Sequence, residues 1–314
     1  MTGMGVKKAE PLVGVPEEEY FTSGHRTCQG CGPCLGTKLV AKAAGSRSIF
    51  LGATGCMYVA NTSYYTTPWA VPWMHTQLGA IGSSTVGTAA GLRALMRKGK
   101  IPREKINVIG LGGDGGTMDI GLSSFSAAMT LDQDLLIVLY DNESYANTGI
   151  QASSLTPWGA RTTFTPPGSV EEHRIGNPRH KKDAVGLVVA GHPDVRYVAT
   201  ACVAYPQDLV TKVKRALNAG GPTFIHLLTP CPKGWGFPPN KTIQIGKLAV
   251  ETGMWRLYEV VEGEHRETYR PGELRPVKDY VRAQERFSHL RDEDIERMQE
   301  ELTTQRKTKL TPSP

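Results

Sequence analysis

The stretch KINVIGLGGDGGTMDIG, residues 105–121, decides the fold. Its first half is a near-continuous apolar run, which is typical of a parallel strand buried on both faces. The run ends in a glycine-rich turn around Asp114, and glycines clustered in this way let the backbone approach a ligand closely. Ligands of parallel sheets bind at the carboxyl ends of the strands, so this turn is a candidate site.

Other short apolar runs alternate with helical patterns along the chain, which predicts an α/β fold with a mostly parallel sheet flanked by helices. Strands are expected at residues 48–54, 105–113, 134–142, 195–201 and 223–229, and helices at 35–44, 81–98, 118–130 and 206–219. We therefore assign residues 1–262 to this α/β domain. Residues 263–314 form a charged C-terminal arm that ends in a polar helix and is expected to contact another subunit.

The composition is that of an ordinary globular protein, with 21% charged and 39% hydrophobic residues among 314. No run reaches the roughly 18 apolar residues of a membrane span, and the N-terminal residues lack the apolar core of a signal peptide. The net charge of +6 is small and both signs are interleaved. We therefore expect no nucleic-acid partner, no membrane contact and a cytoplasmic location.

Two short side chains that carry oxygen follow neighbouring strands. Asp114 stands among Gly113, Gly115 and Gly116 after one strand, and Asn142 follows the next. Their oxygens could bind one hard cation, while the amides of the glycine turn and of the following helix bind a diphosphate. Each residue alone fits a turn former or a helix cap. Together they match the spacing of a thiamine diphosphate motif, with aspartate in place of the usual first asparagine.

Longer segments resemble the thiamine diphosphate-binding β subunit of the 2-oxoacid:ferredoxin oxidoreductases, in the pyruvate and oxalate branch. The resemblance covers nearly the whole chain, through the segments EEEYFTSGHRTCQGCG, TGC, VPWMH, GGDGGTMDIG, YDNESYANTGIQ, TPWGA, KKDAVG and PCPKGW. It implies a thiamine diphosphate-binding fold in which Asp114, the Asn142 side chain and the Ser144 carbonyl hold Mg²⁺ against the cofactor. Asn147 and Thr148 are implied to lie near the thiazolium ring. Asn147 is the implied catalytic residue, because its amide can donate to the oxygen that gains negative charge.

The same resemblance gives four of the six cysteines a role. The family's ligands to one [4Fe-4S] cluster match Cys28, Cys31, Cys56 and Cys231. A Cys-x-x-Cys turn also binds zinc, and the spacing alone does not choose between the two metals. A thiamine site nearby favours the cluster, because iron–sulfur accepts single electrons whereas zinc has no redox chemistry.

Cys34 complicates this assignment, because together with Cys28 and Cys31 it follows the first three positions of a bacterial ferredoxin run. The place of the fourth cysteine in that run is occupied by Lys38. Cys34 also begins an apolar helical stretch, so we assign it to packing, and we assign Cys202 to packing as well.

The resemblance implies oxidative decarboxylation of a small acid, pyruvate or oxalate, with electrons passed through the cluster to ferredoxin. In this family the glutamate that activates thiamine comes from another subunit or domain, and no segment here resembles the one that bears it. We therefore expect an α subunit that completes the thiamine site and a ferredoxin-like subunit with further clusters. Two alternatives stay open: a non-redox thiamine decarboxylase or synthase subunit, and a zinc-stabilised binding module.

The segment TQLGAIGSS, residues 76–84, departs from the pyruvate-branch pattern, because a bulky aromatic residue and an acid are missing. Their loss favours a more anionic substrate such as oxalate, unless the change is a neutral one at a subunit contact. Residues 151–182 lack periodicity and form either a binding loop or a plain surface excursion. His75 could contact an anionic substrate or pack against its neighbours, and Arg161 could contact the substrate or lie on the surface. Neither is assigned as catalytic.

Overall fold

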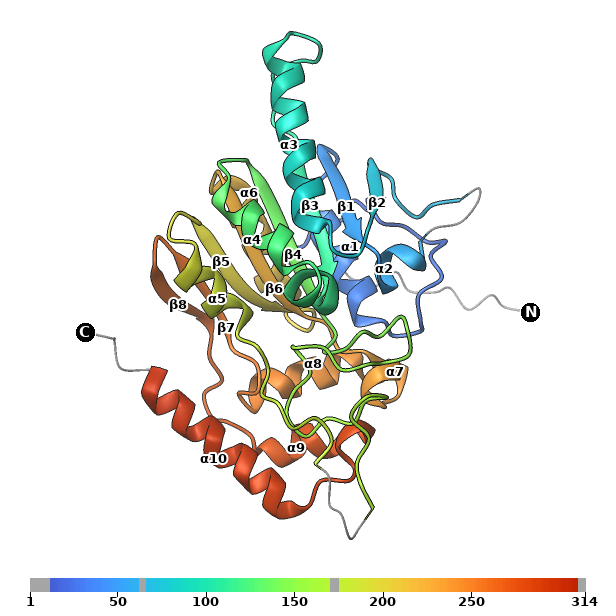
Figure 1. Ribbon diagram of the computed structural model, residues 1–314, viewed down its shortest axis with the longest axis vertical. Helices are drawn as coiled ribbons and strands as arrows, with labels where there is room; N and C mark the ends of the chain where they lie inside the picture. Colours follow the sequence, from blue (N-terminus) through green and yellow to red (C-terminus); the bar gives the residue numbers. More distant parts are fainter. Residues whose placement is uncertain (1–11, 62–65, 170–174, 310–314) are drawn as a thin grey trace.

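The structure is a computed structural model that describes residues 12–61, 66–169 and 175–309. A mixed sheet forms its centre (Figure 1). Its strands are β1 (Ser48–Ala53), β2 (Trp73–Thr76), β3 (Asn107–Gly113), β4 (Leu135–Asp141), β5 (Tyr197–Cys202), β6 (Pro222–Leu228), β7 (Leu257–Val261) and β8 (Glu264–Tyr269). The eight strands lie in the order β2-β1-β3-β4-β6-β5-β7-β8, of which β1 to β6 are mutually parallel and β7 and β8 are antiparallel to their neighbours. The predicted α/β class with a mostly parallel sheet is confirmed.

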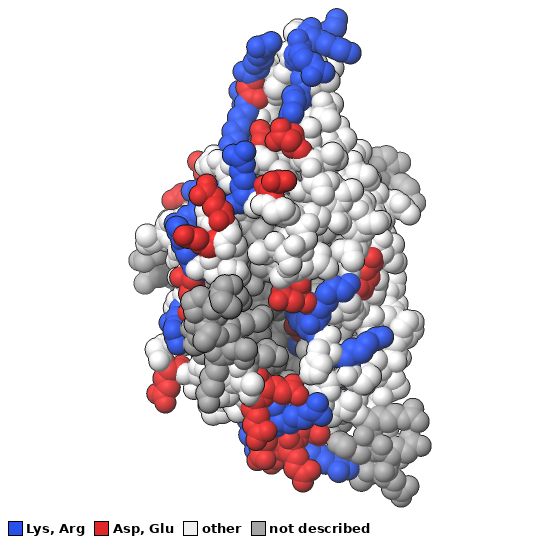
Figure 2. Space-filling view, turned by 60° about the vertical axis from the view of Figure 1, so that its left-hand side comes forward, with Lys and Arg blue, Asp and Glu red and all other residues white. Residues whose placement is uncertain are grey.

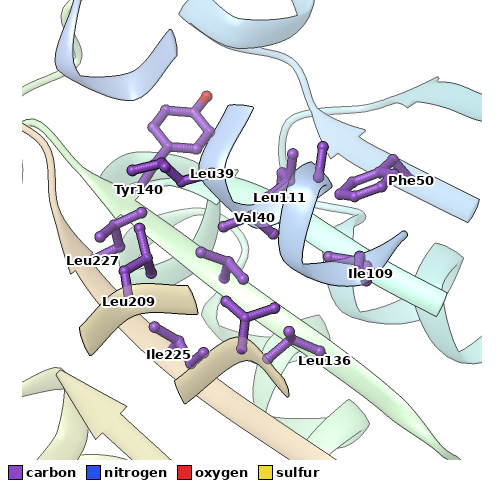
Figure 3. Packing of buried hydrophobic residues seen from close by; sticks show 14 of the residues in the cluster. Leu39, Val40, Phe50, Ile109, Leu111, Leu136, Tyr140, Leu209, Ile225 and Leu227 are labelled. Atoms are coloured by element: carbon purple, nitrogen blue, oxygen red, sulfur yellow. The ribbon is translucent and has the colours of Figure 1, made fainter. Parts of the chain in front are cut away.

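Helices cover both faces of the sheet. One face carries α1 (Gly32–Ala44) and α6 (Pro206–Asn218), and the other carries α3 (Ile81–Arg97), α4 (Leu122–Thr130) and α5 (Ala184–Gly191). Successive side chains of a strand point to opposite faces. Leu136, Val138 and Tyr140 of β4 therefore join the core under α1 and α6 (Figure 3), while the residues between them join the core under α4 and α5. Burial of both faces explains why the strands read as continuous apolar runs.

The predicted helix at 118–130 is wrong in its first part. The chain instead forms a π-helical turn, Gly115–Asp119, and α4 begins only at Leu122. Gly121 returns against the turn so closely that a side chain there would place its Cβ 1.8 Å from the Gly116 carbonyl oxygen. Isolated π-turns of this kind frequently occur at functional sites.

The remaining elements lie mostly toward the carboxyl ends of the strands. They are α2 (Cys56–Val59), α7 (Pro232–Trp235), η2 (Pro239–Lys241), α8 (Thr242–Glu251), α9 (Val277–Arg282), η3 (Glu285–Phe287) and α10 (Asp292–Lys309). The predicted polar C-terminal helix corresponds to α10. Residues after 262 pair with β7 as strand β8 and share a buried cluster with α7 and α8. The division at 262/263 and its subunit contact stay predictions, and residues 310–314 lie outside the described residues.

Helix α3 extends beyond the rest of the molecule at the amino edge of the sheet, away from the glycine turn (Figure 1). Lys and Arg side chains gather at this projecting end (Figure 2), namely Arg93, Arg97, Lys98, Lys100 and Arg103. Within the described ranges no helix combines the length and the apolar character needed to cross a bilayer.

Candidate cofactor and metal-binding site

The two predicted oxygen donors meet at the carboxyl edge of the sheet. Strands β3 and β4 are neighbours, with Gly113 opposite Tyr140, so Asp114 and Asn142 leave the sheet side by side. The Asn142 side-chain amide lies 2.7 Å from the Ser144 carbonyl oxygen and 3.1 Å from Asp114 Oδ1. Turned one way, the amide nitrogen donates to both oxygens, and turned the other way, the amide oxygen joins them as a third acceptor. A hard cation satisfies the second arrangement, so these three residues fit a cation with the amide oxygen turned toward it.

The charge of Asp114 is left uncompensated in this buried position. Burial raises the pKa of Asp114 well above its usual range, and the nearby Asp141 carboxylate raises it further. Asp114 Oδ2 and the Ser144 hydroxyl are buried with no hydrogen-bond partner among the described residues. A buried carboxylate of this kind is paired or coordinates a metal ion, so these residues fit a divalent cation.

The glycine turn leaves no room for side chains. A Cβ on Gly115 would lie 2.0 Å from the Tyr145 ring, and one on Gly116 would lie 3.0 Å from the Leu78 carbonyl oxygen. Leu78 belongs to the divergent segment 76–84, which therefore lies against the turn. The backbone here is enclosed, as a turn that cradles a phosphate group requires.

Asn147 and Thr148 are not brought into this buried group. Both are exposed, and the Thr148 hydroxyl donates a hydrogen bond to the side-chain oxygen of Gln151. They lie in the turn that follows Tyr145, whose backbone pairs with Gln151. Contact of either residue with a substrate therefore stays a prediction.

Cys28, Cys31, Cys56 and Cys231 come together from three distant parts of the sequence. The pKa of Cys56 is raised to about 12 by burial and then by the neighbouring Cys231 and Cys28. Burial also raises the pKa of Cys31, and Cys34, Cys231 and Cys56 contribute in the same direction, in that order. These shifts indicate that the four thiols and Cys34 lie near one another, because negative charge on one thiol opposes ionisation of its neighbours.

Helix N-termini surround these thiols. Cys31 caps α1 and its sulfur accepts a hydrogen bond from the Cys34 amide at 3.4 Å, while Cys231 caps α7 and accepts from the Gly234 amide at 3.3 Å. Cys56 is the first residue of α2. Such amides favour thiolate sulfur, as metal-bound cysteines require. A cavity of about 510 Å³ opens beside Cys28, Cys31 and Cys34.

Cys202 packs in the core, whereas the assignment of Cys34 to packing stays a prediction. Cys34 is half-buried against the core under α1, with its sulfur 3.5 Å from His25 Nε2, and Cys202 is fully buried in β5. Over the described part of the chain, no group of three or more His, Cys, Asp or Glu side chains is arranged to hold a metal ion. The oxygen trio at Asp114 is not a group of this kind, because it contains one carboxylate, one amide and one backbone carbonyl.

Sequence reasoning missed a buried network of charged groups directly beside Asn142. Lys181 Nζ lies 2.6 Å from Asp141 Oδ2 and 2.7 Å from Glu143 Oε1, and Arg286 lies 2.6 Å from Glu143 Oε2. His226 Nε2 completes the network at 2.8 Å from Asp141 Oδ2. The acidic residues that flank Asn142 were the only available signal. Their partners are too far away in the sequence for spacing to identify them.

The charges in this network compensate one another. Burial alone would raise the pKa of Asp141, but Lys181 and His226 outweigh it and lower the pKa to about 2. Burial alone would lower the pKa of Lys181, but Asp141 and Glu143 outweigh it and raise the pKa. Lys181 and Asp141 therefore stay ionised at neutral pH, whereas the pKa of Asp114 is raised.

One hydrogen bond joins the loop of the oxygen trio to the cysteine loop. The Trp235 indole N–H of α7 donates to the Asn142 carbonyl oxygen at 2.8 Å. Cys231 caps the same short helix, and a Cβ on Gly234 would lie 3.4 Å from the Cys231 sulfur and 3.6 Å from the Ser144 hydroxyl. The two candidate sites are therefore neighbours, joined through α7.

Residues 151–182 are attached to the site at both ends. The Ser154 amide donates to Asp119 Oδ2 at 3.1 Å, and Lys182 Nζ lies 3.4 Å from Asp119 Oδ1. Residues 170–174 of this segment lie outside the described residues.

His75 bonds the Thr54 hydroxyl at 3.0 Å and lies beside Tyr58, and burial lowers the pKa of His75. Arg161 is exposed. A substrate contact of His75 or Arg161 therefore stays a prediction.

Known proteins resemble this chain closely in sequence. The family described as thiamine pyrophosphate enzyme, C-terminal TPP binding domain, matches residues 53–227. The pyruvate synthase subunit PorB of Methanocaldococcus jannaschii is 51% identical over 285 residues, which cover 90% of this chain and 94% of that protein. The ketoisovalerate oxidoreductase subunit VorB of Pyrococcus horikoshii is 40% identical over 288 residues, which cover 91% and 90% of the two chains.

A solved structure shares the fold. The 2-oxoglutarate:ferredoxin oxidoreductase from Magnetococcus marinus superposes with a TM-score of 0.54 and 21% identity, over 68% of this chain and 67% of that one. At this identity the match concerns the fold alone, and it agrees with the sheet and helices described above.

Proposed function

Because this chain belongs to the family of the PorB and VorB subunits and carries the C-terminal TPP binding domain of thiamine pyrophosphate enzymes, we propose that it is the thiamine-binding β subunit of a 2-oxoacid:ferredoxin oxidoreductase. The proposed reaction is oxidative decarboxylation of pyruvate with ferredoxin as the electron acceptor. The observation that carries the proposal is that the oxygen trio at Asp114 adjoins a group of four thiols through α7.

In this proposal Asp114, the Asn142 amide oxygen and the Ser144 carbonyl oxygen hold Mg²⁺, and the turn at Gly113, Gly115 and Gly116 receives the diphosphate. The ion would neutralise the buried Asp114 carboxylate and fix the diphosphate. Thiamine diphosphate, when bound, supplies the stabilisation of negative charge at the substrate carbonyl carbon. The residues of this chain orient the cofactor and exclude water.

We assign Cys28, Cys31, Cys56 and Cys231 to one [4Fe-4S] cluster. Each thiolate of such a cluster binds a different iron, so the four sulfurs need not converge on a single point. The amides at Cys34 and Gly234 that donate to cysteine sulfur support this assignment, because hydrogen bonds to sulfur are among the features that set a cluster's potential. The neighbouring thiamine site gives the cluster a source of electrons.

Replacement of Cys34 by alanine is expected to leave about four irons per chain, because its sulfur packs against the core and His25 instead of binding metal. Iron and sulfide analysis of the anaerobically purified protein measures this. If the iron content instead falls toward zero, Cys34 is a cluster ligand and one of the four assigned cysteines is not.

The exposed surface near the site supports the proposed α subunit. Large apolar side chains stand exposed on α2 and β2, just after the π-turn, and in the loop between β4 and α5, namely Val59, Met74, Ile120 and Phe164. Asn147 and Thr148 are exposed in the same loop, which follows Asn142. A subunit that covers these residues would enclose the substrate and bring the activating glutamate. The ferredoxin-like subunit would receive electrons from the cluster.

The chain alone is expected to be inactive, because the group that activates thiamine comes from the α subunit. The test is anaerobic purification of the chain by itself and with its co-purifying partners, followed by assay with a viologen dye. Pyruvate, 2-oxobutyrate, 2-oxoisovalerate, glyoxylate and oxalate are the substrates to compare. Turnover of any of them by the isolated chain would contradict the proposed division of the active site.

Pyruvate is proposed over oxalate because the similar proteins include pyruvate synthase subunits. The divergent segment 76–84 lies against Gly116 and is the feature that argues for oxalate. The same assay separates the two acids directly. A non-redox thiamine enzyme would bind thiamine without iron, and a zinc-stabilised binding module would contain zinc without thiamine.

A further inference from the structure

The charge network beside Asn142 has no part in the proposed chemistry. We propose that Lys181 is a positioning residue that holds residues 141–144 in the conformation that binds magnesium. The inference rests on the proposed function, because it assigns Lys181 a role toward the same metal ion. It concerns a side chain that touches neither the oxygen trio nor the glycine turn.

Lys181 neutralises the two carboxylates on either side of Asn142 in the sequence. Its amine lies 2.6 Å from Asp141 Oδ2 and 2.7 Å from Glu143 Oε1, and its side chain is 22% exposed whereas those of Asp141 and Glu143 are 0% and 6% exposed. Removing one partner of a buried ion pair leaves an uncompensated charge, which is strongly destabilising. Lys181 is therefore a partner that both carboxylates share, whereas His226 pairs with Asp141 and Arg286 pairs with Glu143.

Glu143 has an unusual backbone conformation at the centre of this turn. Its φ of 62° lies in the left-handed region, which is uncommon for residues other than glycine. Its amide donates to Asp141 Oδ1 at 2.8 Å, and its carbonyl accepts from the Thr156 hydroxyl at 2.7 Å. The side chain is held between Lys181 and Arg286. These contacts maintain a conformation that Glu143 would otherwise avoid.

The left-handed residue has a direct consequence for the oxygen trio. It stands between Asn142 and Ser144 and turns the chain sharply, so that the Asn142 side chain reaches both the Ser144 carbonyl oxygen and Asp114. An extended residue at this position would direct the carbonyl elsewhere. Lys181 therefore contributes to metal binding through the backbone of Glu143.

The test is a magnesium titration of the purified complex after removal of divalent ions by chelation. MgCl₂ is added at fixed thiamine diphosphate, and the quenching of tryptophan fluorescence reports cofactor binding. Lys181→Met is expected to raise the magnesium concentration for half-saturation by roughly 10–100-fold, the range found for residues that orient metal ligands. Lys181→Arg, which keeps the charge, is expected to restore binding close to that of the unmodified complex.

Lys212→Met is the matched control. Lys212 is a lysine that is buried more deeply than Lys181, with its amine 2.7 Å from Asp208 Oδ2 and 2.8 Å from the Thr200 carbonyl oxygen. It is expected to lower the unfolding temperature without changing the magnesium requirement. A raised requirement in both Met variants, or in neither, would overturn the inference and leave Lys181 with a structural role only.

Arg286→Gln is a second test variant with a weaker expected effect, because Lys181 still neutralises Glu143 in that variant. A smaller rise in the magnesium requirement is expected. If Lys181→Met fails to assemble, an unchanged requirement in Arg286→Gln overturns the inference. Failure of the unmodified complex to bind thiamine diphosphate with magnesium would instead overturn the proposed function, so the two failures are distinguishable.

Discussion

Replacement of Cys56 by alanine should abolish ferredoxin-coupled turnover while leaving thiamine binding intact. Cys56 is the proposed cluster ligand on α2, and burial together with the neighbouring thiols raises its pKa to about 12. A thiol with such a pKa stays protonated unless a metal ion displaces the proton. Loss of this ligand removes one of four iron attachments. We expect viologen or ferredoxin reduction to fall by more than ~100-fold, beyond the effect usual for residues outside the ligand set.

The measurement compares iron, sulfide and the cluster's electron paramagnetic resonance signal with magnesium-dependent thiamine binding. Cys202→Ala is the matched control, because Cys202 is buried in β5 and packs under α8, with its sulfur 3.6 Å from the Gly246 carbonyl oxygen. It should lose some stability and keep its iron. Full iron content and an unchanged signal in Cys56→Ala would remove Cys56 from the proposed ligand set.

Replacement of Asp114 by asparagine should have opposite effects on cofactor binding and on the stability of the protein free of cofactor. Asp114 supplies the only charge in the oxygen trio, so Asp114→Asn is expected to weaken magnesium-dependent thiamine binding by more than ~100-fold. The carboxylate is also buried without compensation. Its removal should stabilise the metal-free protein at neutral pH by about 1–3 kcal/mol.

The sign of the pH dependence follows from the direction of the pKa shift. The folded-state pKa of Asp114 is raised, first by burial and then by Asp141, so the folded protein binds the proton more tightly than the unfolded chain does. The resulting stability is present below the unfolded pKa and is lost as the pH rises through the folded pKa. Urea unfolding of the metal-free protein should therefore show a fall in stability with rising pH that is reduced in Asp114→Asn.

Magnesium and thiamine diphosphate together should raise the unfolding temperature of the unmodified protein and not that of Asp114→Asn. Asp119→Asn is a suitable control, because Asp119 lies in the same π-turn but bonds Tyr145, Ser154 and Lys182. It should lower stability and leave the magnesium dependence in place. Equal magnesium binding in Asp114→Asn and the unmodified protein would contradict the assignment of Asp114 as a ligand.

The parallel sheet could be predicted because its strands are buried on both faces and are separated by amphipathic helices. The strand that ends at Gly113 shows this, since its apolar run and its glycine turn both appear in the sequence. The short edge strand β2 and the hairpin of β7 and β8 were not predicted. Strand β8 is exposed along its whole length, so burial leaves no apolar pattern in its sequence.

Side chains near Asp114 could be anticipated when their own strand brings them to the edge of the sheet, as for Asn142. Lys181 and Arg286 could not, because each reaches the site from an irregular segment whose path depends on tertiary packing. The π-turn was also missed, because the close approach of Gly121 to Gly116 involves backbone atoms and leaves no hydrophobic periodicity. The irregular structure around the site could therefore not be predicted from hydrophobic periodicity.

The hydrogen bond from Trp235 to the Asn142 carbonyl limits how this protein can be re-engineered. The loop that carries Cys231 leads into α7, the helix that contains Trp235. The Trp235 indole N–H donates a hydrogen bond to the turn at residues 141–144, which holds the proposed magnesium ligands. Transfer of the Cys231 loop and α7 alone to another thiamine enzyme would leave the indole N–H without its acceptor. Transfer of either site must therefore include both α7 and residues 141–144.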